Sequence, residues 1–184
     1  MLLGVVLQAI LGPVAWHVLA WPVNIIVLVL LLAAMGVMYA LRRRVAFFEW
    51  LMHNGAAVPA LTYALTLTII MGLTTQTPMG GLPWIIRMLR FWPFTLAWGW
   101  VMLISGLATL NHLLRFKLRE IPFVLNHLGV FVAVVAATFG SGDGPLGGLW
   151  LKAVYAGILM MLAGAICLML FMAPKHPIEE EDGR

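Results

Sequence analysis

Hydrophobic residues run in long uninterrupted stretches along this chain, and short polar segments separate them. Each stretch has roughly the 20 residues that a helix needs to cross the apolar core of a bilayer. None of them alternates apolar and polar residues in the way that is typical of barrel strands. The pattern therefore predicts an all-α fold, a polytopic transmembrane helix bundle with about five spans near residues 23–41, 51–73, 94–114, 121–140 and 151–173.

The N-terminal segment is a further apolar stretch, and its pattern is compatible with two structures. It is long enough to span a membrane, but Gly12 and Pro13 interrupt it in the middle. It also lacks the basic residues with which a secretory signal begins, so we do not expect it to be cleaved. We expect an interfacial or half-inserted helix over residues 2–11, with a sixth full span as the alternative.

A second interfacial helix is predicted near residues 83–92, between the second and third spans. Pro83 suits the first turn of a helix, and Pro93 is expected to end it. Arg87 and Arg90 lie three residues apart and so share one face, while apolar side chains cover the rest. This combination is typical of a helix that lies in the membrane interface.

The composition supports a membrane location for the whole chain. Of its 184 residues, 63% are hydrophobic and 10% are charged. In a soluble domain about a quarter of the residues are charged. Residues 1–173 are therefore predicted to form a single transmembrane bundle. Residues 174–184 are acidic and lack periodicity, and are predicted to be a short cytoplasmic tail.

The basic residues predict the orientation of the bundle. Alternating topology places only Arg87, Arg90 and Lys152 at one end. The positive-inside rule makes the other end cytoplasmic, so we expect a multi-pass protein of the bacterial inner membrane with its C-terminus in the cytoplasm. The basic residues lie beside spans, which makes lipid headgroups, and not nucleic acid, their expected partner. The cytoplasmic set is Arg42, Arg43, Arg44, Arg115, Lys117, Arg119, Lys175 and Arg184.

Histidines are the candidate functional residues, because ionisable groups inside a membrane are costly and usually functional. His127 is the one clearly inside a predicted span, and His112 is expected at a similar depth on the preceding span. His53 lies near the cytoplasmic start of the second span. Such histidines ligate haem iron, relay protons, or form interhelical hydrogen bonds, for instance with Asn111 or Asn126.

Helical phase places His127 opposite a stripe of small residues on the fourth span. Small residues mark close helix packing, so His127 is expected to face lipid, a groove or a partner. A haem at the edge of the bundle, with a second subunit supplying the other axial ligand, satisfies this arrangement. His112 is less favoured as that ligand, because packed helices are about 8–10 Å apart and a haem between them would open the hairpin. The stripe is Gly129, Ala133, Ala136, Ala137 and Gly140.

Motifs of soluble enzymes are absent from the sequence. It contains no P-loop, CxxC, CxxCH or HExxH pattern, and its single Cys167 has no partner for an intrachain disulfide. The chain therefore has no visible catalytic constellation of its own.

The segment Phe123-Val124-Leu125-Asn126-His127-Leu128-Gly129, running on to Gly140-Ser141, resembles the histidine-containing membrane segment of the ResB (CcsB) family of system II cytochrome c biogenesis. The segments Met71-Gly72-Leu73-Thr74-Thr75-Gln76 and Trp21-Pro22-Val23-Asn24 also resemble a ResB subgroup. The resemblance covers roughly residues 20–145. Members of that family usually carry a large external domain before a final span, so the resemblance is to a reduced form without this domain.

The resemblance implies a haem-handling membrane subunit that acts with a CcsA-type partner and moves or holds haem b for attachment to apocytochrome c. A separate ResB external-domain protein is a further expected partner. At most, the chain is then one subunit of a haem-attachment complex. The family implies His127 as an axial ligand of the iron. By position, His112 is a second cofactor-binding candidate, and Arg115 and Arg119 are candidates for pairing with the propionates.

Two other classes of protein stay open. A b-type cytochrome that anchors a reductase needs two intrachain histidines in sandwiching positions. A non-catalytic membrane scaffold needs none. Transport of ions is less favoured, because no acidic residue lies within the predicted spans.

Overall fold

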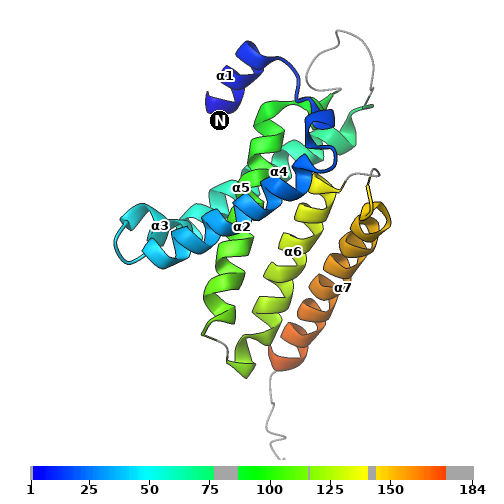
Figure 1. Cartoon of the computed structure of the whole chain (residues 1–184). Coiled ribbons are helices and arrows are strands. Elements are labelled where there is room, and N and C mark those ends of the chain that lie inside the picture. Colours follow the sequence, from blue (N-terminus) through cyan, green and yellow to red (C-terminus); the bar gives the residue numbers. More distant parts are fainter. Residues whose placement is uncertain (1, 77–86, 116, 141–143, 173–184) are drawn as a thin grey trace, which may run out of the picture.

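The chain is described by a computed structural model over residues 2–76, 87–115, 117–140 and 144–172. These ranges contain seven α-helices and no strand, which confirms the predicted all-α class (Figure 1). Three short 3-10 helices, η1 (Trp16–Leu19), η3 (Met88–Arg90) and η4 (Leu118–Glu120), connect some of them. The α-helices are α1 (Leu2–Leu11), α2 (Val23–Leu41), α3 (Ala46–Leu51), α4 (Asn54–Leu73), α5 (Trp92–Leu113), α6 (Ile121–Phe139) and α7 (Gly147–Met172).

Five of these helices, α2, α4, α5, α6 and α7, are long and apolar enough to cross a membrane. This confirms the predicted bundle of about five spans and indicates a multi-pass membrane protein. The second span begins later than the apolar pattern suggested. The short helix α3 ends at Leu51, and the extended backbone of His53 separates it from α4.

The N-terminal segment forms one short helix and not a sixth span. Helix α1 has 10 residues, about half of what a span needs at a rise of about 1.5 Å per residue. Gly12, at φ 71°, is in the left-handed region and bonds back to the carbonyl of Gln8. Gly4 lies against α5, because a Cβ added to it would be 2.8 Å from the Cα of Pro93. The N-terminal helix is thus docked on the beginning of the third span.

Hydrogen bonds tie the segment after α1 to the beginning of α5. The side-chain oxygen of Gln8 accepts the backbone N–H of Trp92 at 3.0 Å, and the Trp92 indole donates to the carbonyl of Gly12 at 3.0 Å. The N–H of Val14 donates to the carbonyl of Arg90 at 2.9 Å. Within this part of the chain, η3 (Met88–Arg90) is the only helical element between Arg87 and α5.

Pro93 does not end a helix, so that expectation is wrong. It lies in the first turn of α5, where proline is tolerated because no carbonyl is placed to accept its missing N–H. The remainder of the predicted interfacial helix, residues 83–86, lies outside the described residues, as does the predicted tail over residues 174–184.

Helix α5 is the centre of the bundle and contains more buried residues than any other helix in the described part of the chain. Alanines of α4 pack against Phe94, Ala97, Val101 and Ile104 of α5. On another face, Leu107 packs with Met35 of α2. In Figure 1, α2 crosses α5 obliquely, and α6 and α7 lie side by side.

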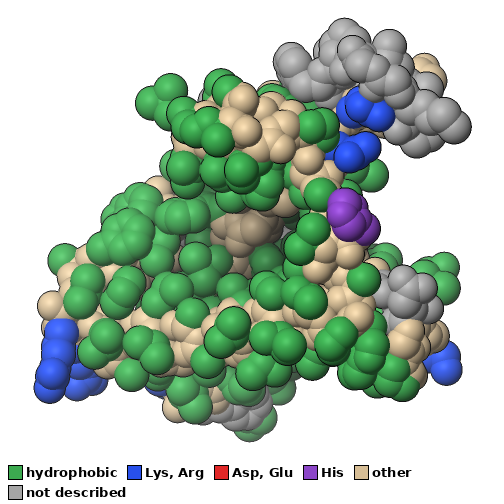
Figure 2. Space-filling model, turned by 45° about the horizontal axis from the view of Figure 1, so that its top comes forward, with side chains coloured by type: hydrophobic (Ala, Val, Ile, Leu, Met, Phe, Trp, Pro, Cys, Tyr) green, Lys and Arg blue, Asp and Glu red, His purple; other side chains and the backbone are tan. Residues whose placement is uncertain are grey.

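Helices α2 and α7 bury few of their residues inside the chain. Their outward side chains are large and apolar, as expected for surfaces in contact with lipid. Figure 2 shows one such face, which is largely hydrophobic, with Lys and Arg at its periphery and no Asp or Glu in view.

The small-residue stripe of α6 packs against α7, as predicted. A Cβ added to Gly129 would be 2.6 Å from the carbonyl oxygen of Gly157, and one added to Gly157 would be 2.7 Å from that of Gly129. Gly140 approaches Trp150 in the same hairpin. Ala137 is exposed and lines a pocket between α6 and α7, together with Trp150 and Val154 of α7. The close contact determines the orientation of α6 and leaves His127 on the side away from α7.

Candidate functional site

His127 lies in the first half of α6, and its ring is held by its own helix. Its Nδ1 lies 2.9 Å from the carbonyl oxygen of Phe123, one turn earlier. A carbonyl only accepts, so Nδ1 carries the proton, and in the neutral ring Nε2 has a free lone pair. No residue within the described ranges bonds that Nε2. Metal-ligating histidines typically have this arrangement, with one ring nitrogen bonded to the protein and the other facing the metal.

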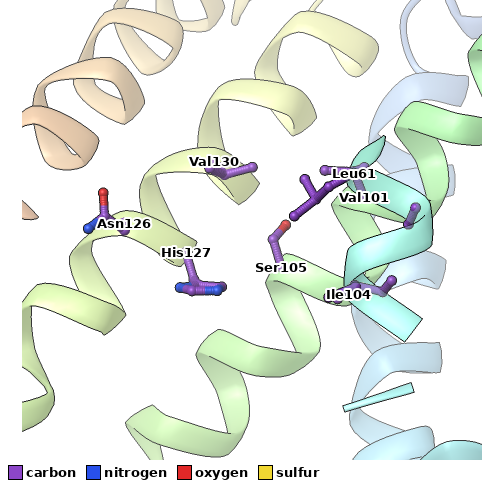
Figure 3. A pocket seen from close by; sticks show the side chains of 9 residues that line it. Leu61, Val101, Ile104, Ser105, Asn126, His127 and Val130 are labelled. Atoms are coloured by element: carbon purple, nitrogen blue, oxygen red, sulfur yellow. The ribbon is translucent and has the colours of Figure 1, made fainter. Parts of the chain in front are cut away.

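The His127 ring borders a small pocket between α4, α5 and α6 (Figure 3). Its volume is about 120 Å³. The Ser105 hydroxyl in its wall donates to the carbonyl of Met102 at 3.0 Å. Its proton is therefore already used and is not offered to a ligand in the pocket. Apart from Ser105, Asn126 and His127 the lining is apolar, and His127 is its one ionisable residue. The lining residues are Ala57, Ala60, Leu61, Val101, Ile104, Ser105, Asn126, His127 and Val130.

Asn126 contributes to the lining of the pocket, but its side-chain amide is directed elsewhere. Its amide donates to the carbonyl of Pro122 at 3.1 Å. It also lies against α7, because a Cβ added to Gly164 would be 2.9 Å from its Nδ2. In Figure 3 its side chain points away from Ser105. The expected alternative, an interhelical hydrogen bond between a histidine and Asn111 or Asn126, is not formed in the described part of the chain.

His112, at the end of α5, lies near His127 but does not touch it directly. The Phe123 ring stacks between them, with its centroid 4.1 Å from that of His112 and 3.8 Å from that of His127. Because both imidazoles contact the same phenyl ring, they lie at similar depth, as predicted from the hairpin. Phe123 fills the space between them, so in this arrangement they do not sandwich a planar cofactor.

A carboxylate orients His112. The Nδ1 of His112 is 2.9 Å from Oε2 of Glu120, which ends η4 (Leu118–Glu120). Both side chains are about one-third exposed, at 33% and 27%. The pair connects the end of α5 to the beginning of α6 and leaves the Nε2 of His112 unbonded within the described residues.

The other predicted candidates lie farther from His127. His53 precedes α4, and its Nδ1 bonds the carbonyl of Glu49 at 2.8 Å. Arg115 follows α5, Arg119 lies in η4, and both are exposed. Both arginines follow His112 in the sequence, and neither has a hydrogen bond or ion pair to His127. The predictions for these three residues stay untested.

Phe123 and Glu120 are members of this site that sequence reasoning missed. Phe123 precedes His127 by one helical turn, a spacing that brings side chains together on a helix surface. Glu120 was the only carboxylate near the predicted hairpin turn. Both signals were present in the sequence, but neither indicates a pairing without the position of His112.

A larger apolar pocket lies on the same face of α6, toward the opposite end of the bundle. Its volume is about 550 Å³. Val134 and Thr138 continue the line of His127 and Val130 along α6, at successive turns. No ionisable residue lines this second pocket. Its walls are Trp16, Thr68, Met71, Leu89, Phe94, Thr95, Leu96, Trp98, Gly99, Met102, Ala133, Val134, Ala137, Thr138, Val154 and Ile158.

No protein-family model matches the chain, and no curated protein or solved structure matches it either. The resemblance to the ResB family therefore stays a prediction, and the site has to be judged on its own chemistry.

The donor chemistry at His127 fits a haem iron, whereas the enclosure is incomplete. The free Nε2 lies in apolar surroundings, which suits an axial ligand. The pocket of about 120 Å³ is well below the roughly 300–1,000 Å³ of ordinary ligand sites. Within the described ranges, no three His, Cys, Asp or Glu side chains come together as a metal-ion site. The chain thus offers one ligand and one wall of a site.

Proposed function

We propose that this protein is a haem-handling membrane subunit of cytochrome c biogenesis, similar to ResB and acting with a CcsA-type partner. The observation that carries the proposal is the state of His127, whose Nδ1 bonds the Phe123 carbonyl while Nε2 is free. When bound, haem b supplies the vinyl groups to which cysteines of an apocytochrome c are joined. In this proposal the protein lies in the bacterial inner membrane, with the α5–α6 turn and the C-terminus in the cytoplasm.

The role of His127 is to bind the iron and fix the position of the haem edge. Its ring is immobilised by the Phe123 carbonyl and by stacking on the Phe123 ring. A fixed imidazole loses less conformational freedom when it binds a ligand than a mobile one does. The buried Val101 and Ile104 of the pocket wall provide apolar contact for a macrocycle.

A partner subunit completes the site in this proposal. The His127 pocket is too small for a whole haem, and Leu61 in its wall is 54% exposed at the surface of α4. A helix of the CcsA-type partner against this surface would cover the haem and supply the second axial ligand. A separate external-domain protein and apocytochrome c are the further partners.

The basic residues at the α5–α6 turn suit the propionates of a haem. Arg115 and Arg119 are exposed there, on the same hairpin as His127. Guanidinium groups bind carboxylates through paired hydrogen bonds. In this proposal they bind the propionates at the membrane boundary, while the apolar ring lies between the helices.

The test is to co-express the chain with its CcsA-type partner and measure haem in the purified complex. We expect His127→Ala to reduce haem retention by at least about tenfold, as loss of metal-site groups commonly does, and to abolish cytochrome c maturation. His53→Ala is the matched control and should keep both. Unchanged haem content and maturation in His127→Ala would reject the proposal.

A b-type cytochrome is the second candidate, and the proximity of His112 to His127 favours it. Both rings leave Nε2 unbonded in the described part of the chain, and one side chain, Phe123, separates them. Because the Phe123 ring fills the space between the histidines, this function requires that ring to move aside. It predicts that the purified single chain binds haem through both histidines and has a reversible redox potential. If His112→Ala and His127→Ala both lose the haem spectrum while cytochrome c maturation stays normal, the b-type cytochrome is favoured over the biogenesis subunit.

A further inference from the structure

Phe123 occupies the space between two potential iron ligands. Its ring is tilted by 44° to His112 and by 21° to His127, with centroid separations of 4.1 and 3.8 Å. These centroid separations are below the range of about 4.5–7 Å that is usual for pairs of aromatic rings. No further group therefore fits between the phenyl ring and either imidazole. The phenyl ring therefore sets the separation of the two imidazoles.

Both imidazoles are oriented in the same chemical sense. His127 donates from Nδ1 to the Phe123 carbonyl, and His112 is held through Nδ1 by the Glu120 carboxylate. Each neutral ring then has its lone pair on Nε2. The two residues are equally prepared to bind a metal, and what distinguishes them is that only His127 borders the apolar pocket.

We propose that Phe123 is a positioning residue that prevents His112 from joining His127 as the second axial ligand of a bound haem. This inference rests on the proposed haem-handling function. With Phe123 in place, the chain supplies one histidine, and the other axial position is left for a ligand from outside the chain. A haem held by one histidine of this subunit is released more readily than one held by two. Phe123 thus favours a subunit that passes haem on over one that retains it.

The location of Phe123 makes this idea testable by mutation. Its side chain is 37% exposed, whereas its neighbour Val124 is 7% exposed and packs in the interior. Removal of the phenyl ring therefore takes little from the core, and we expect Phe123→Ala to fold. Phe123→Tyr keeps the ring and adds only a hydroxyl, so it serves as the conservative variant.

The experiment uses the full chain in detergent or nanodiscs, loaded with haem b, without a partner. Absorption and electron paramagnetic resonance spectra report the axial ligands, and transfer of haem to apomyoglobin reports its release. In the wild type, the spectrum should depend on His127 and not on His112. In Phe123→Ala, it should shift to the low-spin form of two histidines, and transfer should slow.

The double variant Phe123→Ala/His112→Ala should lose that shift, and Phe123→Tyr should behave as the wild type. If Phe123→Ala keeps the wild-type spectrum while His127-dependent haem is present, the inference about Phe123 is wrong and the proposed function stands. If His112→Ala alone changes the wild-type spectrum, Phe123 does not separate the ligands, which also overturns the inference. If neither the wild type nor Phe123→Ala binds haem without a partner, the inference about Phe123 falls, whereas the proposed function, in which a partner completes the site, stands.

Discussion

His127 contacts Phe123 twice, through a hydrogen bond of 2.9 Å from its Nδ1 to the Phe123 carbonyl and through ring stacking at 3.8 Å between centroids. The backbone contact determines which ring nitrogen is free, and the side-chain contact determines what lies beside the ring. One residue thus controls both the protonation pattern and the surroundings of the histidine that borders the pocket between α4, α5 and α6. The local sequence Phe-x-x-x-His is enough to produce this, because residues four apart share one face of a helix.

The first prediction concerns the imidazole of His127 itself. His127→Gly removes the ring and leaves a space beside the pocket, so haem binding should be lost and should return when free imidazole is added. His127→Phe fills the space and should not be rescued. The measurement is haem retained by the co-purified complex at increasing imidazole concentration. Equal recovery in both variants would show that imidazole acts elsewhere.

The second prediction concerns the Glu120 carboxylate that orients His112. Because both side chains are about one-third exposed, Glu120→Gln should cost at most about 1 kcal/mol of stability. Made in the otherwise wild-type chain, it should leave haem binding unchanged, because His112 is not an iron ligand while Phe123 is present. Thermal unfolding and haem content are the measurements, with Glu49→Gln as the control. A clear loss of haem in Glu120→Gln would contradict the role given to Phe123.

The third prediction concerns the close contact between α6 and α7. Gly157→Leu places a side chain where even a Cβ would be 2.7 Å from the Gly129 carbonyl oxygen. Overpacking of this kind costs about 1–3 kcal/mol or more, and the obstacle is backbone, so α7 has to move away. Gly72→Leu is the matched control, since nothing lies within 4 Å of a Cβ there. Thermal stability in detergent should fall in the first variant only.

Much of the fold could be predicted because the lipid-spanning pattern is simple. Length and apolar character gave the spans, and the spacing of Gly129 and Ala133 indicated the packing face of α6. The behaviour of Pro93 could not be predicted in the same way. A proline in the first turn of a helix and a proline that ends a helix look alike in a sequence. Which role Pro93 has depends on whether α5 begins at Trp92. The hydrogen bonds of Trp92 with Gln8 and Gly12 help to determine that start.

The candidate site could be predicted only in part. The orientation of His127 away from the small-residue stripe followed from helical phase alone. Its hydrogen-bond partner could not be found that way, because an interhelical bond to Asn111 and a bond to the Phe123 carbonyl of its own helix are both compatible with the sequence. The hydrogen bond within the helix forms because the Phe123 carbonyl is always within reach, whereas the Asn126 amide lies against Gly164 of α7.

The fourth prediction concerns Asn24, a buried polar residue that connects α2 to the end of α6. Its Nδ2 donates to the carbonyl of Phe139 at 2.8 Å, its Oδ1 accepts the N–H of Ile25 at 2.9 Å, and its side chain is 1% exposed. Asn24→Leu removes this donor and leaves the Phe139 carbonyl without its side-chain hydrogen bond. Hydrogen bonds between membrane helices contribute about 0.6 kcal/mol on average and up to about 2 kcal/mol, and full burial places this one toward the upper value.

Thr66→Val is the control for Asn24→Leu, because the Thr66 hydroxyl bonds the Thr62 carbonyl of its own helix and its loss should be nearly neutral. Unfolding by denaturant in mixed micelles measures both variants. Because the bond joins α2 to the end of α6, its loss should loosen that end and leave the His127 end intact. Haem retention in Asn24→Leu should therefore match the wild type at temperatures where the variant is folded. A parallel loss of stability and of haem would mean that α2 supports the His127 site directly, contrary to the arrangement of α4, α5 and α6 around it.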